Sequence, residues 1–295
     1  MKIHLAGSEN AFTDRHWVPQ PKTNVFLSYY SKAATKAIVE GTRPEPRGTL
    51  TIDSGAHSFF ACLRLSASNR YTSMKMPDPK EYFKTYLDWL LSHERRWDYF
   101  VELDLQEIVG LSQVKEWRRE YERAGIAKRA IWVYHNCDPW SEFEYIANES
   151  PSRYIGTEGV RRGRPLLPFA KMIRYAYDHS CRIHGFAMIK NRYLNSFPFY
   201  SIDSSSWACT SRFGVLPRFN EQRGLVQYIP LYHHEMYRRL QLPERLNATH
   251  GKMTDEAPLY WLQRGEEAFR RLERHLTEMW EARGIKWTEK MNEPA

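Results

Sequence analysis

Cysteine is scarce and widely scattered in this sequence, which excludes two common kinds of structural framework. The 295 residues contain four cysteines, Cys62, Cys137, Cys181 and Cys209. Their separations match neither a zinc site nor a small domain held together by disulfides. We therefore expect reduced and mostly packed thiols, no bound metal and a cytoplasmic protein.

Long apolar runs are also missing. No stretch of about 18 apolar residues occurs, and Met1-Lys2-Ile3-His4 lacks the apolar stretch of a signal peptide. The sequence therefore predicts neither export nor a membrane partner. The hydrophobic content of 42% is enough for a sizeable core, and the net charge of +8 favours a polyanionic partner, although a basic surface also serves solubility alone.

Short apolar segments alternate with amphipathic segments along the chain, which is typical of βα units and a parallel sheet. We predict an α/β fold, a TIM-type (β/α)8 barrel, as a single domain over residues 1–295. A long C-terminal helix is expected at about 254–287. The segment 24–30 is predicted to be helical, although its period is ambiguous, and residues 225–229 are the candidate eighth strand.

The segment from Ser112 to Ala124 has the pattern of an amphipathic helix that ends at Gly125. Its apolar stripe is expected to face the core. We interpret its basic residues, which alternate with glutamates, as one solvated and self-paired face formed by Lys115, Arg118, Arg119 and Arg123.

Three predicted strands end in a carboxylate: Leu50-Thr-Ile-Asp53, Tyr99-Phe-Val-Glu-Leu-Asp104 and Phe199-Tyr-Ser-Ile-Asp203. In a parallel barrel the carboxyl ends of the strands meet at the mouth that holds the active site. Clustered carboxylates acquire the different pKa values that acid, base and nucleophile roles require. The competing interpretation is that each aspartate caps the helix or turn that follows it.

Other residues at or near predicted strand ends could have either a functional or a structural role. Gly156 would permit a planar ligand to approach the backbone closely. The basic residues that follow are candidates for phosphate contacts, although a solvated loop would look the same: Arg161, Arg162 and Arg164. A single strand histidine, His184, is more often structural than catalytic, so we assign it no chemistry.

Five short motifs appear in order along the predicted barrel. They are Asp53-Ser-Gly-Ala, Val101-Glu-Leu-Asp104, Tyr154-Ile-Gly156, Ile183-His-Gly-Phe186 and Phe199-Tyr-Ser-Ile-Asp203-Ser-Ser-Ser-Trp207. Together, over about residues 1 to 230, they resemble the tRNA-guanine transglycosylase superfamily. The resemblance is strongest to its DNA-modifying branch in phages and bacterial islands, the DpdA-type DNA-guanine transglycosylases.

The resemblance implies an enzyme that replaces guanine in DNA with a 7-deazaguanine such as 7-cyano-7-deazaguanine. Asp203 matches the nucleophile that forms a covalent bond with the deoxyribose, and Asp53 matches the carboxylate that handles protons. Asp104 matches the acid that pairs with the guanine edge, and Gly156 matches a backbone position that lines the base pocket. This agrees with the carboxylate pair that glycosyl transfer through a covalent intermediate requires.

Further substrate contacts are expected from Ser54, Gly55, His135 and Ser204. No cofactor is expected. The tRNA enzymes of the superfamily carry a Cys-x-Cys-x-x-Cys cluster and a later histidine that hold structural zinc, and this cluster is missing here. The sequence therefore predicts a protein without zinc and counts against a standard tRNA enzyme.

Three alternatives stay open. A tRNA-guanine transglycosylase would use the same carboxylates on RNA. A barrel N-glycoside hydrolase would use water as the acceptor and release base without incorporation. A barrel that only binds nucleic acid would keep its affinity and all other activity when Asp203 is replaced with Ala. The three strand-end carboxylates make this the weakest of the three alternatives.

Overall fold

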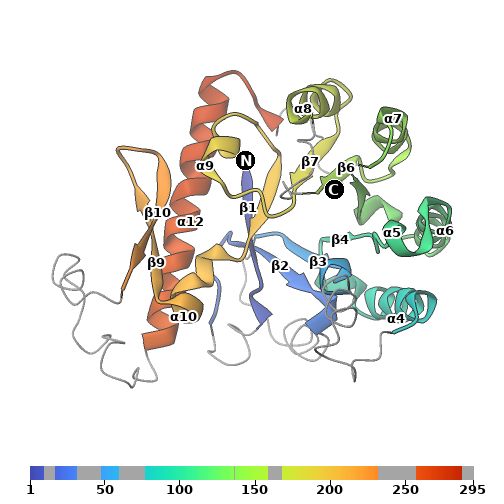
Figure 1. The fold of residues 1–295 in the computed structure, drawn as a ribbon, viewed down its shortest axis with the longest axis horizontal. Helices are drawn as coiled ribbons and strands as arrows, with labels where there is room; N and C mark the ends of the chain where they lie inside the picture. Colours follow the sequence, from blue (N-terminus) through green and yellow to red (C-terminus); the bar gives the residue numbers. More distant parts are fainter. Residues whose placement is uncertain are drawn as a thin grey trace.

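Eight parallel strands close into a barrel, which confirms the predicted (β/α)8 architecture (Figure 1). The computed structural model describes residues 1–9, 17–31, 48–59, 77–135, 137–158, 168–231 and 257–287. The predicted phosphate contacts Arg161, Arg162 and Arg164 lie outside these ranges. The barrel strands are β1 (Lys2–Ala6), β2 (Asn24–Ser28), β3 (Leu50–Asp53), β4 (Tyr99–Val101), β5 (Ala130–Tyr134), β6 (Tyr154–Thr157), β7 (Arg182–Gly185) and β8 (Ser201–Ser204).

The barrel closes where β8 pairs with β1, in a register that places His4 opposite Asp203. On the other side of β1, the register with β2 places His4 opposite Asn24. Successive residues of a strand point to opposite faces, so every second residue of each strand fills the barrel interior.

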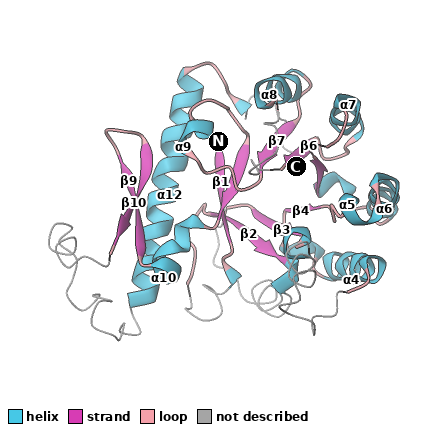
Figure 2. Ribbon diagram, in the orientation of Figure 1, coloured by secondary structure: helices cyan, strands magenta, loops and turns pink. Residues whose placement is uncertain are grey.

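Helices surround the strands, as Figure 2 shows. They are α4 (Pro79–Ser92), α5 (Gln106–Val109), α6 (Leu111–Arg123), α7 (Trp140–Glu149), α8 (Phe169–Asp178), α9 (Asn191–Leu194), α10 (Cys209–Phe213) and α12 (Ala257–Ala282). α4 shows how local sequence sets a boundary: Asp78 accepts hydrogen bonds from the backbone N–H groups of Lys80 and Glu81, both at 2.9 Å, and Pro79 occupies the first helical position.

The long helix α12 packs along β1 and begins within the predicted 254–287 segment. The Glu273 carboxylate accepts a hydrogen bond from the backbone N–H of Ile3 at 2.6 Å, and the Trp280 indole donates to the Leu194 carbonyl at 3.1 Å. α12 therefore covers the barrel where β8 meets β1. No helix in the described ranges is long and apolar enough to cross a bilayer.

Two predicted elements were wrong, and the errors are linked. Residues 24–28 form strand β2 rather than a helix, followed by a 3-10 turn over Tyr29–Ser31. Val25, Phe26 and Leu27 are all buried, because barrel strands are covered on both faces, and such a continuous apolar run has no period to distinguish strand from helix. The missing strand left an eighth place to fill, and residues 225–229 were assigned to it.

Residues 225–230 instead form β10 (Leu225–Pro230), which pairs antiparallel with β9 (Val215–Asn220) outside the barrel. This hairpin packs on α12, on the side away from β1 (Figure 1). Trp261 of α12 is buried against Leu216 of the hairpin.

Arg118 was predicted to be solvated, and this too was wrong. Its side chain is 2% exposed and forms ion pairs with Glu102 at 2.7 Å and Glu142 at 3.0 Å. Glu102 also accepts a hydrogen bond from the backbone N–H of Val133 at 2.6 Å. The buried ion pairs therefore connect the end of β4 with β5, α6 and α7. The neighbouring Arg119 behaves as predicted, because it pairs with Glu116 on the exposed face.

Replacing Arg118 with Met is expected to lower the free energy of unfolding by about 3–5 kcal/mol, because it leaves the buried Glu102 carboxylate without its cation, whereas Glu142 keeps Lys115 at 2.6 Å. Urea denaturation measures this change. Arg119→Met is the matched control on the same helix and should cost less than about 1 kcal/mol, since its ion pair is exposed. Equal effects of the two substitutions would show that the buried pairs do not contribute as proposed.

Candidate active site at the barrel mouth

A cavity of about 480 Å³ opens at the C-terminal ends of the barrel strands. The three predicted carboxylates, Asp53, Asp104 and Asp203, all line it. Asp53 is the last residue of β3, Asp104 lies three residues beyond β4 and Asp203 is the second-to-last residue of β8, so the barrel brings together residues that are 150 positions apart in sequence. The other lining residues come from the ends of the barrel strands and the loops after them: Ala6, Gly7, Glu9, Phe26, Ser28, Ala56, His57, Val101, Val133, His135, Glu158, Phe186, Ala187 and Ser205.

Asp203 is anchored through one of its two carboxylate oxygens. Its Oδ1 accepts hydrogen bonds from the backbone N–H of Ala187 at 2.8 Å and from Nε2 of His184 at 3.3 Å. Ala187 has a φ of 53°, a left-handed conformation that is costly for a residue with a side chain and that here accompanies donation to Asp203. Within the described residues Oδ2 makes no hydrogen bond, so it is the oxygen available to a ligand.

Burial, and after it the charge of the nearby Asp203, raise the pKa of Asp53 to about 7. Glu9 adds to this repulsion, while a hydrogen bond from the backbone N–H of Gly55 opposes it. The Gly55 N–H lies 3.2 Å from Asp53 Oδ2. Asp53 therefore exchanges its proton near neutral pH, which is the range in which a general acid and base works best.

Gly55 is required at its position by the backbone. Its φ is +83°, and an added Cβ would lie 2.7 Å from Cβ of Tyr30. The neighbouring Ser54 is fully buried, its backbone carbonyl accepts a hydrogen bond from the Tyr82 hydroxyl at 2.8 Å, and its side chain is not part of the cavity lining. These two predicted substrate contacts thus shape the turn after β3.

Asp104 and His135 form a second polar pair on the cavity wall. Asp104 Oδ2 lies 3.5 Å from His135 Nε2, and the Asp104 side chain is 19% exposed. The backbone N–H of His135 donates to Asp138 at 3.1 Å, which holds the turn after β5. The pair offers a carboxylate acceptor and an imidazole to one face of a bound molecule.

Gly156 and Ser204 occupy positions next to the cavity rather than in its lining. A Cβ on Gly156 would lie 2.6 Å from Cε2 of Phe186, so the glycine makes room for that ring, which does line the cavity. Ser204 Oγ accepts a hydrogen bond from the backbone N–H of Ser206 at 3.0 Å. Because Ser204 follows the inward-facing Asp203 in β8, its side chain points away from the barrel interior.

Two carboxylates and one imidazole at the barrel mouth were not among the predicted site residues. Glu158 and Glu9 are buried residues that line the cavity, and His184 lies beneath Asp203. Glu158 directly follows β6, which is the same strand-end signal that identified the three aspartates. Glu9 lies three residues beyond β1 and its carboxylate accepts a hydrogen bond from the backbone N–H of Ser28, a contact between strands that one segment alone does not reveal.

The cavity is rich in carboxylates, yet the described residues contain no cluster of three or more His, Cys, Asp or Glu side chains that could hold a metal ion. Among the described cysteines, Cys181 and Cys209 are buried free thiols and Cys137 is exposed.

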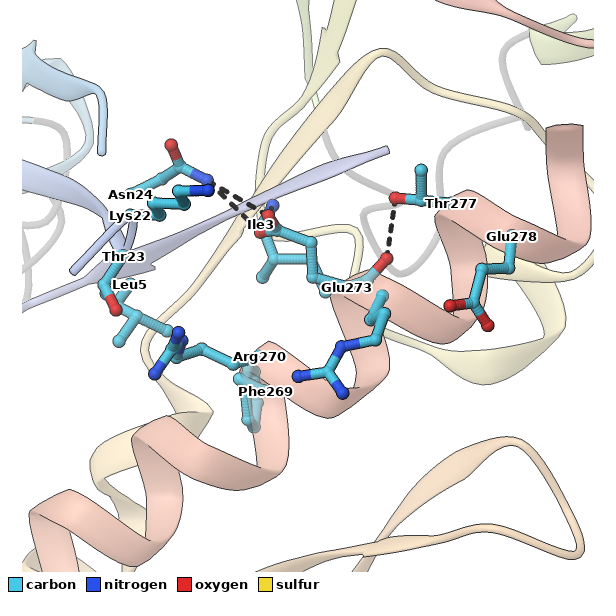
Figure 3. A pocket seen from close by; sticks show the side chains of 11 residues that line it. Ile3, Leu5, Lys22, Thr23, Asn24, Phe269, Arg270, Glu273, Thr277 and Glu278 are labelled. Carbon is cyan, nitrogen blue, oxygen red and sulfur yellow. Dashed lines mark hydrogen bonds between the residues drawn. The ribbon is translucent and has the colours of Figure 1, made fainter. Parts of the chain in front are cut away.

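A second hollow, of about 460 Å³, lies between α12 and the strands β1 and β2 (Figure 3). Its central carboxylate, Glu273, accepts hydrogen bonds from the Ile3 backbone and from the Asn24 amide at 3.2 Å. Burial raises the pKa of Glu273. The polar groups of this hollow thus join α12 to two strands.

No known family model matches this chain, and no curated protein matches it either. The fold and the cavity together define a (β/α)8-barrel protein with an acidic pocket at the C-terminal mouth, the position of the active site in enzymes of this architecture.

Proposed function

We propose that the protein is a DNA-guanine transglycosylase, a pentosyltransferase that exchanges guanine in DNA for a 7-deazaguanine such as 7-cyano-7-deazaguanine. One observation carries the proposal: a carboxylate with one anchored and one free oxygen, Asp203, shares a cavity with Asp53, whose pKa is about 7. Glycosyl transfer through a covalent intermediate needs one nucleophilic carboxylate and one proton-handling group. The motifs that resemble the transglycosylase superfamily support the same reaction.

In the first step, Asp203 Oδ2 attacks C1′ of the deoxyribose while the bond from C1′ to guanine N9 breaks. Asp53 in its protonated form supplies the proton that the leaving guanine needs. In the second step, the Asp53 carboxylate accepts the N9 proton of the incoming 7-deazaguanine. N9 then attacks C1′ and the ester bond to Asp203 breaks, which restores both carboxyl groups.

The guanine must leave the base stack before it enters the cavity. Unstacking costs a few kcal/mol in a duplex, so single-stranded or distorted DNA should react faster. We assign phosphate contacts to Arg161, Arg162 and Arg164, in keeping with the net charge of +8. DNA affinity should accordingly fall steeply with salt, since phosphate contacts release counterions, and an affinity independent of salt would argue against these contacts.

Asp104→Asn is expected to reduce base selection. The carboxylate is proposed to accept hydrogen bonds from the guanine edge, and a lost partner for a polar edge costs about 1–3 kcal/mol, roughly tenfold to a hundredfold. The measurement is the ratio of kcat/KM for guanine over hypoxanthine, which lacks the exocyclic amino group. Asp88→Asn on the exposed face of α4 is the matched control, and an unchanged ratio in Asp104→Asn would remove Asp104 from base recognition.

The exchange reaction itself is tested with guanine-labelled DNA, and separately with labelled tRNA, each with and without 7-cyano-7-deazaguanine. The proposal predicts that label release from DNA beyond one equivalent per protein occurs only with the deazaguanine, together with a matching new nucleoside detected by mass spectrometry. Release without incorporation would indicate an N-glycoside hydrolase. Incorporation into tRNA alone would indicate a tRNA-guanine transglycosylase, and no reaction on either polymer would contradict the proposal for the isolated protein.

A further inference from the structure

A buried chain of hydrogen bonds runs from Asp203 into the barrel interior. His184 Nε2 lies 3.3 Å from Asp203 Oδ1, and its other ring nitrogen, Nδ1, lies 2.7 Å from Ser201 Oγ. Ser201 Oγ in turn lies 2.5 Å from the hydroxyl of Tyr154. His184 and Ser201 are fully buried and Tyr154 nearly so, and none of the three lines the cavity.

With a neutral His184 ring, the hydrogens of this chain have one consistent arrangement. A carboxylate only accepts, so His184 Nε2 donates to Asp203 and Nδ1 is left as an acceptor. The Ser201 hydroxyl then donates to Nδ1, and the Tyr154 hydroxyl donates to Ser201. Burial raises the pKa of Tyr154, so its phenol keeps the proton that starts the chain. The chain therefore selects one tautomer of His184, with Nε2–H directed at Asp203.

Aromatic packing fixes the plane of the His184 ring. Phe26 stacks on it, with ring centroids 5.6 Å apart and an interplanar angle of 5°. Phe186 and His4 contact it edge-on at 4.8 Å and 5.8 Å. An imidazole held on several sides loses little entropy when it donates a hydrogen bond, because its orientation is already determined.

Serine, histidine and aspartate also form the catalytic triad of serine hydrolases. In this protein, however, the aspartate and not the serine stands at the accessible end of the hydrogen-bonded chain. In that triad the serine meets the substrate and the aspartate is the buried end. Here Ser201 is fully buried, while the Asp203 side chain is 12% exposed and lines the cavity. The reacting end of this chain is therefore the carboxylate.

We propose that His184 is a positioning residue for Asp203: with Ala187 N–H it holds Oδ1 and directs Oδ2 toward the sugar, and Ser201 and Tyr154 fix the tautomer that makes this possible. The inference rests on the proposed function for the identity of the reaction. It adds a residue to which the sequence had assigned no chemistry.

The test compares substitutions that keep or remove the donor. His184→Leu should lower kcat for exchange by about 10²-fold, since a small misplacement of a reacting group costs that much, while KM and DNA affinity change little. His184→Gln, whose amide N–H can reach Asp203, should retain activity within about tenfold of wild type. His179→Leu is the control: it removes an imidazole at the exposed C-terminal end of α8, where the ring contacts Tyr175 and none of the residues around Asp203, and it should leave kcat unchanged.

Two outcomes would overturn the inference. One is equal activity of His184→Leu and wild type, and the other is an equal loss in His184→Gln and His184→Leu with unchanged thermal unfolding. Ser201→Ala should act through the same chain, so the double variant Ser201→Ala/His184→Leu should be no slower than His184→Leu alone. Multiplying effects would indicate independent, structural roles.

A measurement that needs no activity separates this inference from the proposed function. Nitrogen-15 NMR of the histidine rings in the wild-type protein should show His184 with the proton on Nε2, and Ser201→Ala should introduce the other tautomer. A proton on Nδ1 in the wild type would overturn the inference whatever reaction the protein catalyses. If His184 carries the proton on Nε2 but neither DNA nor tRNA reacts, the proposed transglycosylase function is wrong, whereas the positioning of Asp203 by His184 is retained.

Discussion

Asp203→Asn is expected to lower the rate of base exchange by about 10⁴-fold or more, since removal of a nucleophile that acts with its partners as a unit has effects of this size. The amide cannot form the ester with C1′, so no covalent DNA adduct should be detected. DNA affinity should change little, because a single side chain inside the cavity contributes little beside the phosphate contacts. The measurements are single-turnover label release and a DNA-binding titration.

Asp178→Asn, on the exposed end of α8, is the matched control for this substitution and should leave all three quantities unchanged. A covalent adduct that persists in Asp203→Asn would reject Asp203 as the nucleophile. A large loss of DNA affinity would assign it to binding instead.

The second large effect is expected at Asp53. Its pKa of about 7 means that the protonated form, which the departing guanine needs, becomes scarce above neutral pH. The rate of guanine release should therefore fall above about pH 7 in the wild type. Asp53→Asn should slow release by about 10²–10⁴-fold, the usual contribution of a positioned proton donor, and should remove this pH dependence. A variant with the same decline above pH 7 would place the titrating group elsewhere.

The same carboxyl group makes stability depend on pH, and the sign follows from proton binding. The native state keeps the Asp53 proton up to about pH 7, whereas the unfolded chain releases it near pH 4. Folding therefore loses free energy as pH rises from about 4 to about 7, by at most about 4 kcal/mol. Asp53→Asn should be more stable than wild type at pH 8 and similar at pH 4, measured by urea denaturation. An Asp53→Asn variant that is less stable at pH 8 would contradict the raised pKa.

The barrel and its three aspartates could be predicted because each rests on a local signal. An apolar run that stops at a carboxylate marks a strand end wherever it occurs, and parallel strands bring such ends together. Glu158, which directly follows β6, carries this signal as well, although it was not among the predicted site residues.

The errors have equally specific physical causes. Arg118 lies in the buried stripe of α6, four residues after Val114 and next to Trp117. Helical spacing alone therefore favours a buried side chain at this position, whereas a charged residue type favours an exposed one, and the prediction followed the residue type. A buried charge requires partners, and Glu102 and Glu142 come from two other segments. The pattern of a single helix does not contain that information.

His184 could not be assigned from its own strand for the same reason. Its partners Ser201, Tyr154 and Asp203 lie on neighbouring strands, and only the register of β6, β7 and β8 brings them within hydrogen-bond distance. Carboxylates at strand ends can be identified from the sequence alone. The groups that orient them can be identified only once the pairing of the strands in the closed barrel is known.

The most direct test of the central claim is to map the covalent intermediate in the wild-type protein. The protein is mixed with guanine-containing single-stranded DNA without an incoming base, denatured quickly, digested with protease and nuclease, and analysed by mass spectrometry. A deoxyribosyl nucleotide attached to the peptide that contains Asp203, and lost on addition of 7-cyano-7-deazaguanine before denaturation, is the predicted result. An adduct on Asp53 or Asp104, or guanine release with no adduct on any residue, would contradict it.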